Sequence, residues 1–326
     1  MSEGLTVGVF GSEQASKLTF ESSVAKKSEV DGVTVYHRKE GEKRISFLDD
    51  AGFPERIQGY ASIASFSDLS VYLYPQSWKL SPTDGELAVL LNSFKVPGSF
   101  AVETIDESLL ARLRGGFKGT VLDSYTMIAK ERWSTASSVF EPGFATPRED
   151  FRRDGTLIYV DRVFNVKGLG TVALGFILSG SVSVHDSLRP IPLPKDCGLE
   201  VKGIQINDVD MDSAGRGIRV GLALKGADVR ELQKTHWLDD SSFALAESLV
   251  FEFAKSPFYR QPVVERDLHV QLPGEMVPAF LDKANREGEL TAKLASQVPT
   301  WKGMRLAVMD LNGRPLRVAG GGTLNL

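Results

Sequence analysis

A loop near the N-terminus has residues of the types and spacing that bind phosphate. Residues 8–20 read GVFGSEQASKLTF, and Gly11 and Lys17 stand where the first glycine and the lysine stand in the pattern G-x-x-x-x-G-K-[ST]. In that pattern backbone N–H groups wrap the phosphates, the lysine neutralises their charge, and the final hydroxyl holds magnesium. Here Ser16 replaces the second glycine and Leu18 replaces the hydroxyl residue. The sequence leaves three interpretations: a nucleotide site, the remnant of one, or a coincidence.

The segments around this loop predict an α/β domain over residues 1–146. Short apolar runs predict strands, and apolar positions at helical spacing next to capping or glycine signals predict helices. The expected strands lie at 5–10, in both arms of a hairpin within 32–50, at 68–75 and at 98–106. The expected helices lie within 54–66, 81–94 and 106–116. This alternation favours a mostly parallel sheet with helices on both faces.

The second half of the chain predicts two antiparallel β-barrels. Residues 141–155 are polar and contain two prolines and two glycines, so we expect a linker there. Short strands separated by turn residues follow, which is typical of small barrels. We place the first barrel at 147–242 and the second at 243–326, with a hairpin turn at Asn312 and Gly313.

Composition and charge narrow the functional classes. The 326 residues are 42% hydrophobic and 25% charged with a net charge of −4, so no strong overall field attracts nucleic acid or an anionic membrane. We find no membrane-spanning apolar run, no signal-peptide pattern and no metal-ligand spacing. The single cysteine, Cys197, cannot form an internal disulfide, which fits a reducing cytosol. We expect a cytoplasmic monomer without a membrane partner.

The order of domains and the sequence of the first barrel resemble the translational GTPases of the EF-Tu type. Residues 160–188 read VDRVFNVKGLGTVALGFILSGSVSVHDSL, and 220–226 read VGLALKG; both are most similar to the second domain of the SelB branch. The resemblance covers nearly the whole chain; it is strongest over 157–240, moderate over 1–110 and weak after 243. Selenocysteine-specific factors carry a further RNA-binding domain, which we do not expect here.

The motifs of that family are altered in the first domain. Asp49 and Gly52 match D-x-x-G, but Phe53 stands where the family has the histidine that positions water. The guanine-reading N-K-x-D falls at ETID, where Glu103 and Thr104 replace Asn and Lys. The loop that carries a magnesium-binding threonine is reduced to the RKEGEK hairpin. The resemblance assigns a vestigial nucleotide site to Gly11, Lys17, Asp49, Gly52 and Asp106.

These changes predict that catalytic GTP hydrolysis is lost and that GTP with magnesium is disfavoured as a cofactor. A simpler interpretation makes Lys17 a solvated lysine at the start of a helix. In the same interpretation Asp49 and Asp106 serve only capping or turn chemistry. We favour this simpler interpretation for all three residues.

The resemblance also implies a tRNA-binding pocket between the first and second domains. It places the aminoacyl group near Asp161 and Arg162, with a second basic position at Arg219, whose charge suits a polarised acyl group. Around the terminal adenosine it places Phe164, Gly168, Gly170 and Thr171. Alternatives remain open: the glycines serve a bulge or barrel corner, Phe164 is core, and Arg162 pairs with Asp161 on the surface.

Binding of tRNA also needs basic side chains that contact phosphates. The candidates are Lys255, Arg260, Arg266, Arg152 and Arg153. Tyr259 or Phe258 is a candidate to stack on a base or ribose. Charged loops of this kind are more often solvated surface.

Three functions fit these observations. The first is a SelB-like elongation-factor relative that binds aminoacyl-tRNA without GTP-driven release, with Ala51 and Phe53 packing the former switch region shut. The second is a divergent but active GTP-binding translation factor. The third is a ribosome-binding regulator without affinity for tRNA. The fold alone does not decide among them.

Overall fold

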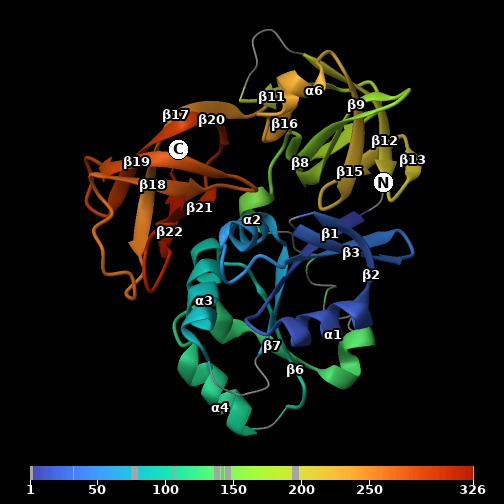
Figure 1. The fold of residues 1–326 in the computed structure, drawn as a ribbon. Coiled ribbons are helices and arrows are strands. Elements are labelled where there is room, and N and C mark those ends of the chain that lie inside the picture. Colours follow the sequence, from blue (N-terminus) through green and yellow to red (C-terminus); the bar gives the residue numbers. More distant parts are fainter. Residues whose placement is uncertain are drawn as a thin grey trace.

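The computed structural model shows three domains (Figure 1), and it describes residues 3–31, 33–74, 80–105, 107–135, 140, 143, 148–192 and 198–325. An α/β domain is formed by the first part of the chain, and two antiparallel β-barrels follow. In the view of Figure 1 both barrels lie above the α/β domain. The predicted fold class is confirmed.

Domain 1 is built on a seven-stranded sheet with the order β2-β3-β4-β1-β5-β6-β7. Its strands are β1 (Glu3–Phe10), β2 (Lys26–Asp31), β3 (Val33–Glu40), β4 (Lys43–Asp50), β5 (Leu69–Leu73), β6 (Gly98–Val102) and β7 (Thr126–Ala129). The central strand β1 runs parallel to β4 and β5, and the parallel arrangement continues to β7. β3 and β4 form the expected hairpin, with β2 antiparallel at the edge.

Helices cover both faces of this sheet, as expected. They are α1 (Gln14–Val24), α2 (Gln58–Phe66), α3 (Pro82–Phe94) and α4 (Glu107–Gly116), with 3₁₀ turns at Val121–Ser124, Lys130–Thr135 and Glu149–Phe151. On one face Phe20 of α1 packs edge-on against Phe47 of β4. On the other face Tyr60 of α2 packs 5.0 Å from the ring of Phe10 of β1. α3 begins at Ser81, whose hydroxyl accepts a hydrogen bond from the Asp84 N–H in a capping box.

Domain 2 is a barrel because the first strand of its main sheet also pairs with the second-last strand. The strands follow the order β11-β16-β8-β9-β15-β12-β13, and β11 also pairs with β12, which closes a ring. The strands are β8 (Leu157–Val166), β9 (Gly170–Ser179), β10 (Ser181–Ser183), β11 (Ser187–Ile191), β12 (Leu199–Ile206), β13 (Val209–Met211), β14 (Ser213–Gly215), β15 (Arg219–Lys225) and β16 (Trp237–Asp239), with a short helix α6 (Val229–Leu232).

Domain 3 is a closed barrel with the order β17-β20-β19-β18-β21-β22. Its strands are β17 (Ala244–Lys255), β18 (Arg266–Gln271), β19 (Met276–Lys283), β20 (Glu289–Thr300), β21 (Arg305–Met309) and β22 (Val318–Leu324). β21 and β22 pair as expected, and the predicted turn at Asn312 and Gly313 is present, with the Gly313 N–H donating to the Asp310 carbonyl, but it lies within a longer loop. The connection spans residues 310–317, because Met309 is already paired with Val318 and the intervening residues form a longer loop.

Arg148, Asp150 and Phe151, within the predicted linker, are buried, whereas residues 152–154 are exposed. Arg148 forms an ion pair with Asp150 and donates to the backbone oxygens of Ala64 (3.1 Å) and Ser67 (3.0 Å) of domain 1. The indole N–H of Trp301 in domain 3 donates to the Asp150 carbonyl at 2.7 Å. The predicted boundary at residues 146 and 147 lies outside the described residues. Arg148 and Asp150 of the linker therefore connect domain 1 to domain 3.

Candidate functional site

Lys17, at the position of the lysine in the phosphate-binding pattern, is buried and paired. Lys17 is 2% exposed, and its ammonium donates to Asp49 Oδ1 (2.8 Å) and to the Tyr60 hydroxyl oxygen (2.7 Å). The Tyr60 hydroxyl in turn donates to Asp49 Oδ1 at 2.7 Å. The prediction of a solvated Lys17 is wrong, because α1 directs this side chain onto the carboxyl end of β4. The prediction of turn chemistry for Asp49 is also wrong, because Asp50 accepts the Gly52 N–H bond of that turn.

The backbone around Lys17 is helical where a phosphate loop would be open. α1 begins at Gln14, so the N–H of Lys17 donates to the Glu13 carbonyl and is already satisfied. The Ser16 hydroxyl donates to the Glu13 carboxylate at 3.2 Å, which places an anion beside the first turn. Gly11 has a φ of 153°, and a Cβ there would lie 3.0 Å from the Leu73 carbonyl oxygen. Gly11 thus serves the close approach of β1 to β5.

A second acid shares this buried site. Glu21 is fully buried one helical turn after Lys17, and burial raises its pKa to about 8, with repulsion from Asp49 acting in the same direction. The positive charge of Lys17 opposes part of that rise. Near neutral pH the Glu21 side chain therefore keeps its proton beside the Lys17–Asp49 pair.

The segment after β4 is in contact with domain 3. Phe53 is 7% exposed and lies 5.0 Å from the Tyr60 ring, as expected for a switch region that is packed shut. Ala51 is exposed, so the expectation that it joins this packing is wrong. Arg317 of domain 3 lies over the Phe53 ring and donates to the Glu55 carbonyl at 3.2 Å.

The segment that the resemblance aligns with the guanine-reading motif follows β6. Glu103 forms a solvent-accessible ion pair with Lys130 at 2.7 Å. Asp106 lies outside the described residues. Among the residues that are described, no group of three or more His, Cys, Asp or Glu side chains is arranged to hold a metal ion.

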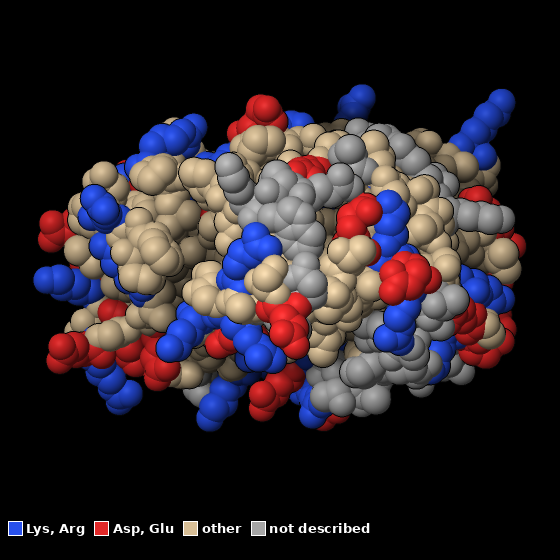
Figure 2. Space-filling view, turned by 90° about the horizontal axis from the view of Figure 1, so that it is seen from below, with Lys and Arg blue, Asp and Glu red and all other residues tan. Residues whose placement is uncertain are grey.

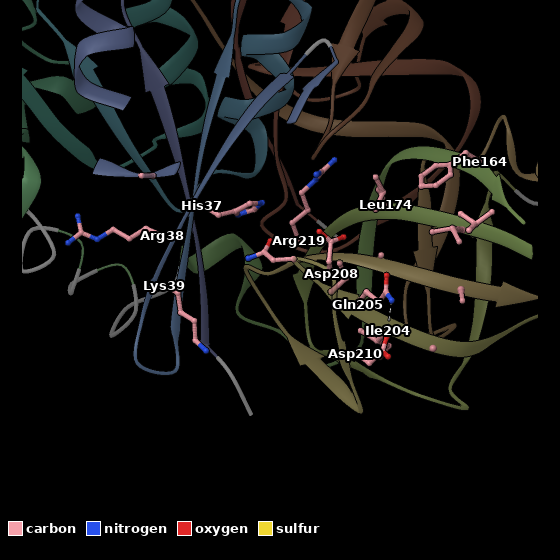
Figure 3. A pocket seen from close by; sticks show the side chains of 18 of the residues that line it. His37, Arg38, Lys39, Phe164, Leu174, Ile204, Gln205, Asp208, Asp210 and Arg219 are labelled. Carbon is pink, nitrogen blue, oxygen red and sulfur yellow. Dashed lines mark hydrogen bonds between the residues drawn. The ribbon is translucent and has the colours of Figure 1, made fainter. Parts of the chain in front are cut away.

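A cavity of about 1150 Å³ lies between domains 1 and 2, where the resemblance places the aminoacyl end of tRNA. Domain 1 contributes the end of α1 and residues His37, Arg38 and Lys39 of β3. The domain 2 wall includes Phe164, Leu169, Leu174, Gln205, Asp208, Asp210 and Arg219. In Figure 3, His37 extends toward Arg219, whereas Arg38 extends away from domain 2.

Of the two predicted residues Arg219 and Asp161, Arg219 lines the cavity and holds Asp161 by an ion pair. Arg219 donates to Asp161 Oδ2 from both Nε (3.1 Å) and a terminal nitrogen (2.7 Å), and it lies over the Phe176 ring. Arg219 is thus a partner of Asp161, and the surface pair of Arg162 with Asp161 stays a prediction. Arg162 shares the strand face of Phe164 through the alternation of β8, but it does not line the cavity.

The other predicted pocket residues have different surroundings. Phe164 is half-buried and lines the cavity, so its assignment to the core is wrong. Gly168 and Gly170 have φ values of +84° and +93° in the turn between β8 and β9, and a Cβ at either would meet nothing within 4 Å. Their backbone conformation explains the glycines, and the space around them is open. Thr171 is buried, and its hydroxyl donates to the Ala227 carbonyl at 3.1 Å.

The predicted phosphate contacts are only partly available. Tyr259 is buried and its hydroxyl donates to Asp310. Arg266 donates to the Tyr259 hydroxyl oxygen and forms an ion pair with Asp310. Lys255 donates to the Gln261 carbonyl at 2.7 Å, and Arg260 is exposed. Phe258, in contrast, is 69% exposed. Arg152 is also exposed, and Arg153 lies over the rings of Phe243 and Trp301, where burial lowers its pKa.

Sequence reasoning missed the wall that domain 1 contributes to the cavity and the buried role of Glu21. The i, i+4 spacing of Lys17 and Glu21 was the available signal for the second. Asn207 and Asp208, both with positive φ, form the turn that brings Asp208 and Asp210 to the cavity. An Asn-Asp pair between two short strands is a turn signal that could have indicated this.

Comparisons with known proteins agree with this architecture. No protein-family model matches the chain. An uncharacterized protein of Methanocaldococcus jannaschii is 26% identical over 325 residues, which is 99% of this chain and 100% of that protein. The selenocysteine-specific elongation factor of the same organism is 22% identical over 317 residues, covering 86% of this chain and 67% of that factor.

Solved structures of such factors share the fold. Elongation factor SelB from Methanococcus maripaludis, in complex with the GTP analogue GppNHp, matches 100% of this chain and 79% of its own, with a TM-score of 0.80 and 19% identity. A bacterial selenocysteine-specific factor, EF-Sec, matches 99% of this chain and 58% of its own, with a TM-score of 0.83 and 15% identity. The resemblance to SelB-type translation factors and the three-domain architecture are confirmed. Within the described residues, no helix has the length and apolar character needed to span a membrane.

Proposed function

We propose that this relative of the SelB-type elongation factors is a translation factor that binds the aminoacylated end of tRNA without using GTP. The observation that carries the proposal is the cavity of about 1150 Å³ between domains 1 and 2, lined by Phe164 and Arg219. Its position is the one that the resemblance assigns to the aminoacyl end. Selenocysteine-specific factors are proteins of translation, and similarity to them over most of the chain supports this class of function.

The lining of the cavity suits an aminoacyl ester of adenosine. Arg219 remains 12% exposed and Asp161 23% exposed, so their ion pair can open toward a ligand. The guanidinium can then donate to the ester carbonyl, while the carboxylate accepts from the amino group. Phe164, Leu169 and Leu174 supply an apolar surface on which the adenine ring can lie.

The buried polar cluster supports the loss of GTP chemistry. The charge of Lys17 is balanced by Asp49, and Leu18, which is 49% exposed, offers no oxygen to a metal. A triphosphate at this position would meet Asp49 and the Glu13 carboxylate, so its negative charge is opposed. The cost of separating Lys17 from Asp49 adds to that repulsion.

The contacts between domains explain how such a protein works without a nucleotide switch. In translational GTPases the γ-phosphate orders the switch segments. Here Arg317 of domain 3 binds Glu86 of α3 through several buried hydrogen bonds, and Arg216 of domain 2 pairs with buried Asp68. We infer that the binding arrangement is permanent, so release of the tRNA depends on a partner rather than on hydrolysis.

A binding experiment tests this function. Wild-type protein is expected to retain aminoacylated tRNA better than deacylated tRNA in a filter assay, and Phe164→Ala is expected to weaken both because the adenine loses its apolar surface. Lys234→Ala, at an exposed position of domain 2, is the matched control. Equal retention of charged and uncharged tRNA by the wild type would reject the aminoacyl pocket.

The second candidate function is an active GTPase, which the complex of a structural neighbour with GppNHp favours. Calorimetry with GTP and magnesium separates the two candidates. Our proposal predicts no binding tighter than about 100 µM. A submicromolar, magnesium-dependent site would establish the alternative.

A further inference from the structure

A second cavity, of about 800 Å³, lies between domains 1 and 3. Domain 1 contributes the end of α3 and residues 118–120. Domain 3 contributes the ends of β17 and β22 and the turn at 286–289. In Figure 1 α3 lies on the side of domain 1 that faces domain 3, whereas α1, which borders the first cavity, lies on the other side. The two cavities are therefore separate sites.

Positive side chains line this second cavity from both domains. They are Lys95 and Lys118 of domain 1 and Lys255, Arg286 and Arg305 of domain 3. Within the described part of the chain, none of these five side chains forms an ion pair with a carboxylate. Elsewhere on the surface basic and acidic side chains are interspersed, as the face in Figure 2 shows. Three carboxylates, those of Glu252, Glu287 and Glu289, line the same cavity, so the five cations outnumber the acids there without pairing with them.

Two of these cations are held close together at the carboxyl end of α3. Lys95 has a left-handed backbone (φ 50°), and its ammonium donates to the Asn92 side chain at 2.9 Å. Arg305 donates to the Phe94 carbonyl at 3.0 Å, which leaves other guanidinium N–H groups for a ligand. Burial lowers the pKa of Lys95, and the neighbouring charge of Arg305 lowers it further. An anion between them would relieve this repulsion.

An exposed aromatic ring borders the same cavity. Phe258, in the loop after β17, is 69% exposed, so its ring does not pack into the rest of the protein. Glu252, Glu287 and Glu289 also line the cavity and supply only hydrogen-bond acceptors. The combination of cations, a free ring face and acceptors matches phosphate, base and ribose hydroxyls, respectively.

We propose that this second cavity binds a nucleotide unit through its phosphate groups, with the base stacked on Phe258. The unit is either a free nucleotide or part of a single RNA strand, because both present the same chemistry. Lys118 and Arg286 approach the phosphates from opposite domains, so the ligand bridges domains 1 and 3. This site goes beyond the proposed binding of an aminoacyl end, which uses the cavity between domains 1 and 2.

Fluorescence anisotropy and calorimetry with three probes test the proposal. The probes are a fluorescein-labelled, 5′-phosphorylated hexauridylate, ATP, and inorganic triphosphate. We expect the wild type to bind hexauridylate or ATP, and Lys118→Glu with Arg286→Glu to weaken that binding at least about tenfold, because charge-assisted contacts are lost. Phe258→Ala is expected to weaken it at least about fivefold and to leave triphosphate binding unchanged.

The controls separate this site from the first cavity and from a general effect of charge. Lys302→Glu and Lys234→Glu change exposed lysines outside both cavities and should bind as the wild type does. Arg219→Ala, in the first cavity, should also leave binding of hexauridylate and ATP unchanged, whatever it does to aminoacyl-tRNA. Stronger binding of hexauridylate identifies an RNA strand, and stronger binding of ATP identifies a free nucleotide. Absence of binding by both, or binding indifferent to Lys118→Glu with Arg286→Glu or to Phe258→Ala, would overturn the proposal.

Discussion

Two ion pairs in this protein each join a basic side chain to an aspartate, but they differ in how far they are exposed to solvent. Lys17 and Asp49 in domain 1 are 2.8 Å apart and each 2% exposed. Arg219 and Asp161 in domain 2 are 2.7 Å apart but 12% and 23% exposed. The first pair is closed beneath α1 together with Tyr60, whereas the second borders a cavity. Only the second pair can exchange its internal partner for a ligand at moderate cost.

The comparison shows that two ion pairs in one protein can differ in how readily they accept a ligand. A buried pair is expensive to separate, because each charge would be left without water or a partner. A pair at the edge of a cavity stays in contact with solvent and is worth less to stability. We infer that Lys17 stabilises domain 1, whereas Arg219, although paired with Asp161, is accessible from the cavity.

The largest expected effect is on the buried pair. Lys17→Met leaves Asp49 buried without its cation, so the free energy of unfolding should fall by about 3–5 kcal/mol. Urea denaturation followed by circular dichroism measures it. The double variant Lys17→Met with Asp49→Leu should recover part of the loss. A loss below about 1 kcal/mol in the single variant would show that this pair is not structural.

The next effect concerns the accessible pair. Arg219→Ala removes a charge-assisted donor, so affinity for aminoacylated tRNA should fall about tenfold or more, and affinity for deacylated tRNA should fall less. Filter binding of both tRNA forms measures the difference, with Lys234→Ala as the control. Equal losses for both forms would place Arg219 outside the aminoacyl pocket.

A pH effect distinguishes the buried cluster from the accessible pair. Burial raises the pKa of Glu21 from 4.5 to about 8, so the folded state keeps a proton that the unfolded state releases between these pH values. Stability should therefore fall as pH rises from about 4.5 to 8, with a slope contribution of about 1.4 kcal/mol per pH unit. Glu21→Gln should remove this contribution in unfolding curves measured across the range. An exposed control, Glu131→Gln, should leave the slope as it is; an unchanged slope in Glu21→Gln would refute the assignment.

The smallest effect is expected at the exposed pair of the former guanine-reading segment. Lys130 and Glu103 are 45% and 38% exposed, so Lys130→Ala should change the free energy of unfolding by no more than about 1 kcal/mol. The same urea assay measures this change in the free energy of unfolding and compares it with that of Lys17→Met. A loss as large as that of Lys17→Met would mean that exposure does not separate the two classes of pair.

The elements of the fold follow from local patterns, whereas the partners of charged residues do not. The apolar run before Gly11, the capping signal at Ser81 and the strands after residue 155 all carry periodicities that predict their structures. The partner of Lys17 depends on Asp49 and Tyr60, which are distant in sequence and meet only through the sheet and α2. The position of Arg219 could be inferred from a resemblance, but its pairing with Asp161 depends on the register of two barrel strands. The contribution of β3 to the cavity wall could not be predicted from the sequence, because it depends on how domains 1 and 2 are placed relative to each other.

The most direct test of the account is the dissociation constant of aminoacylated tRNA measured with and without GTP and magnesium. A closed Lys17 site and an open cavity predict the same affinity under both conditions. An affinity that rises severalfold or more with GTP and magnesium would show that the nucleotide site still controls binding, and would contradict the account.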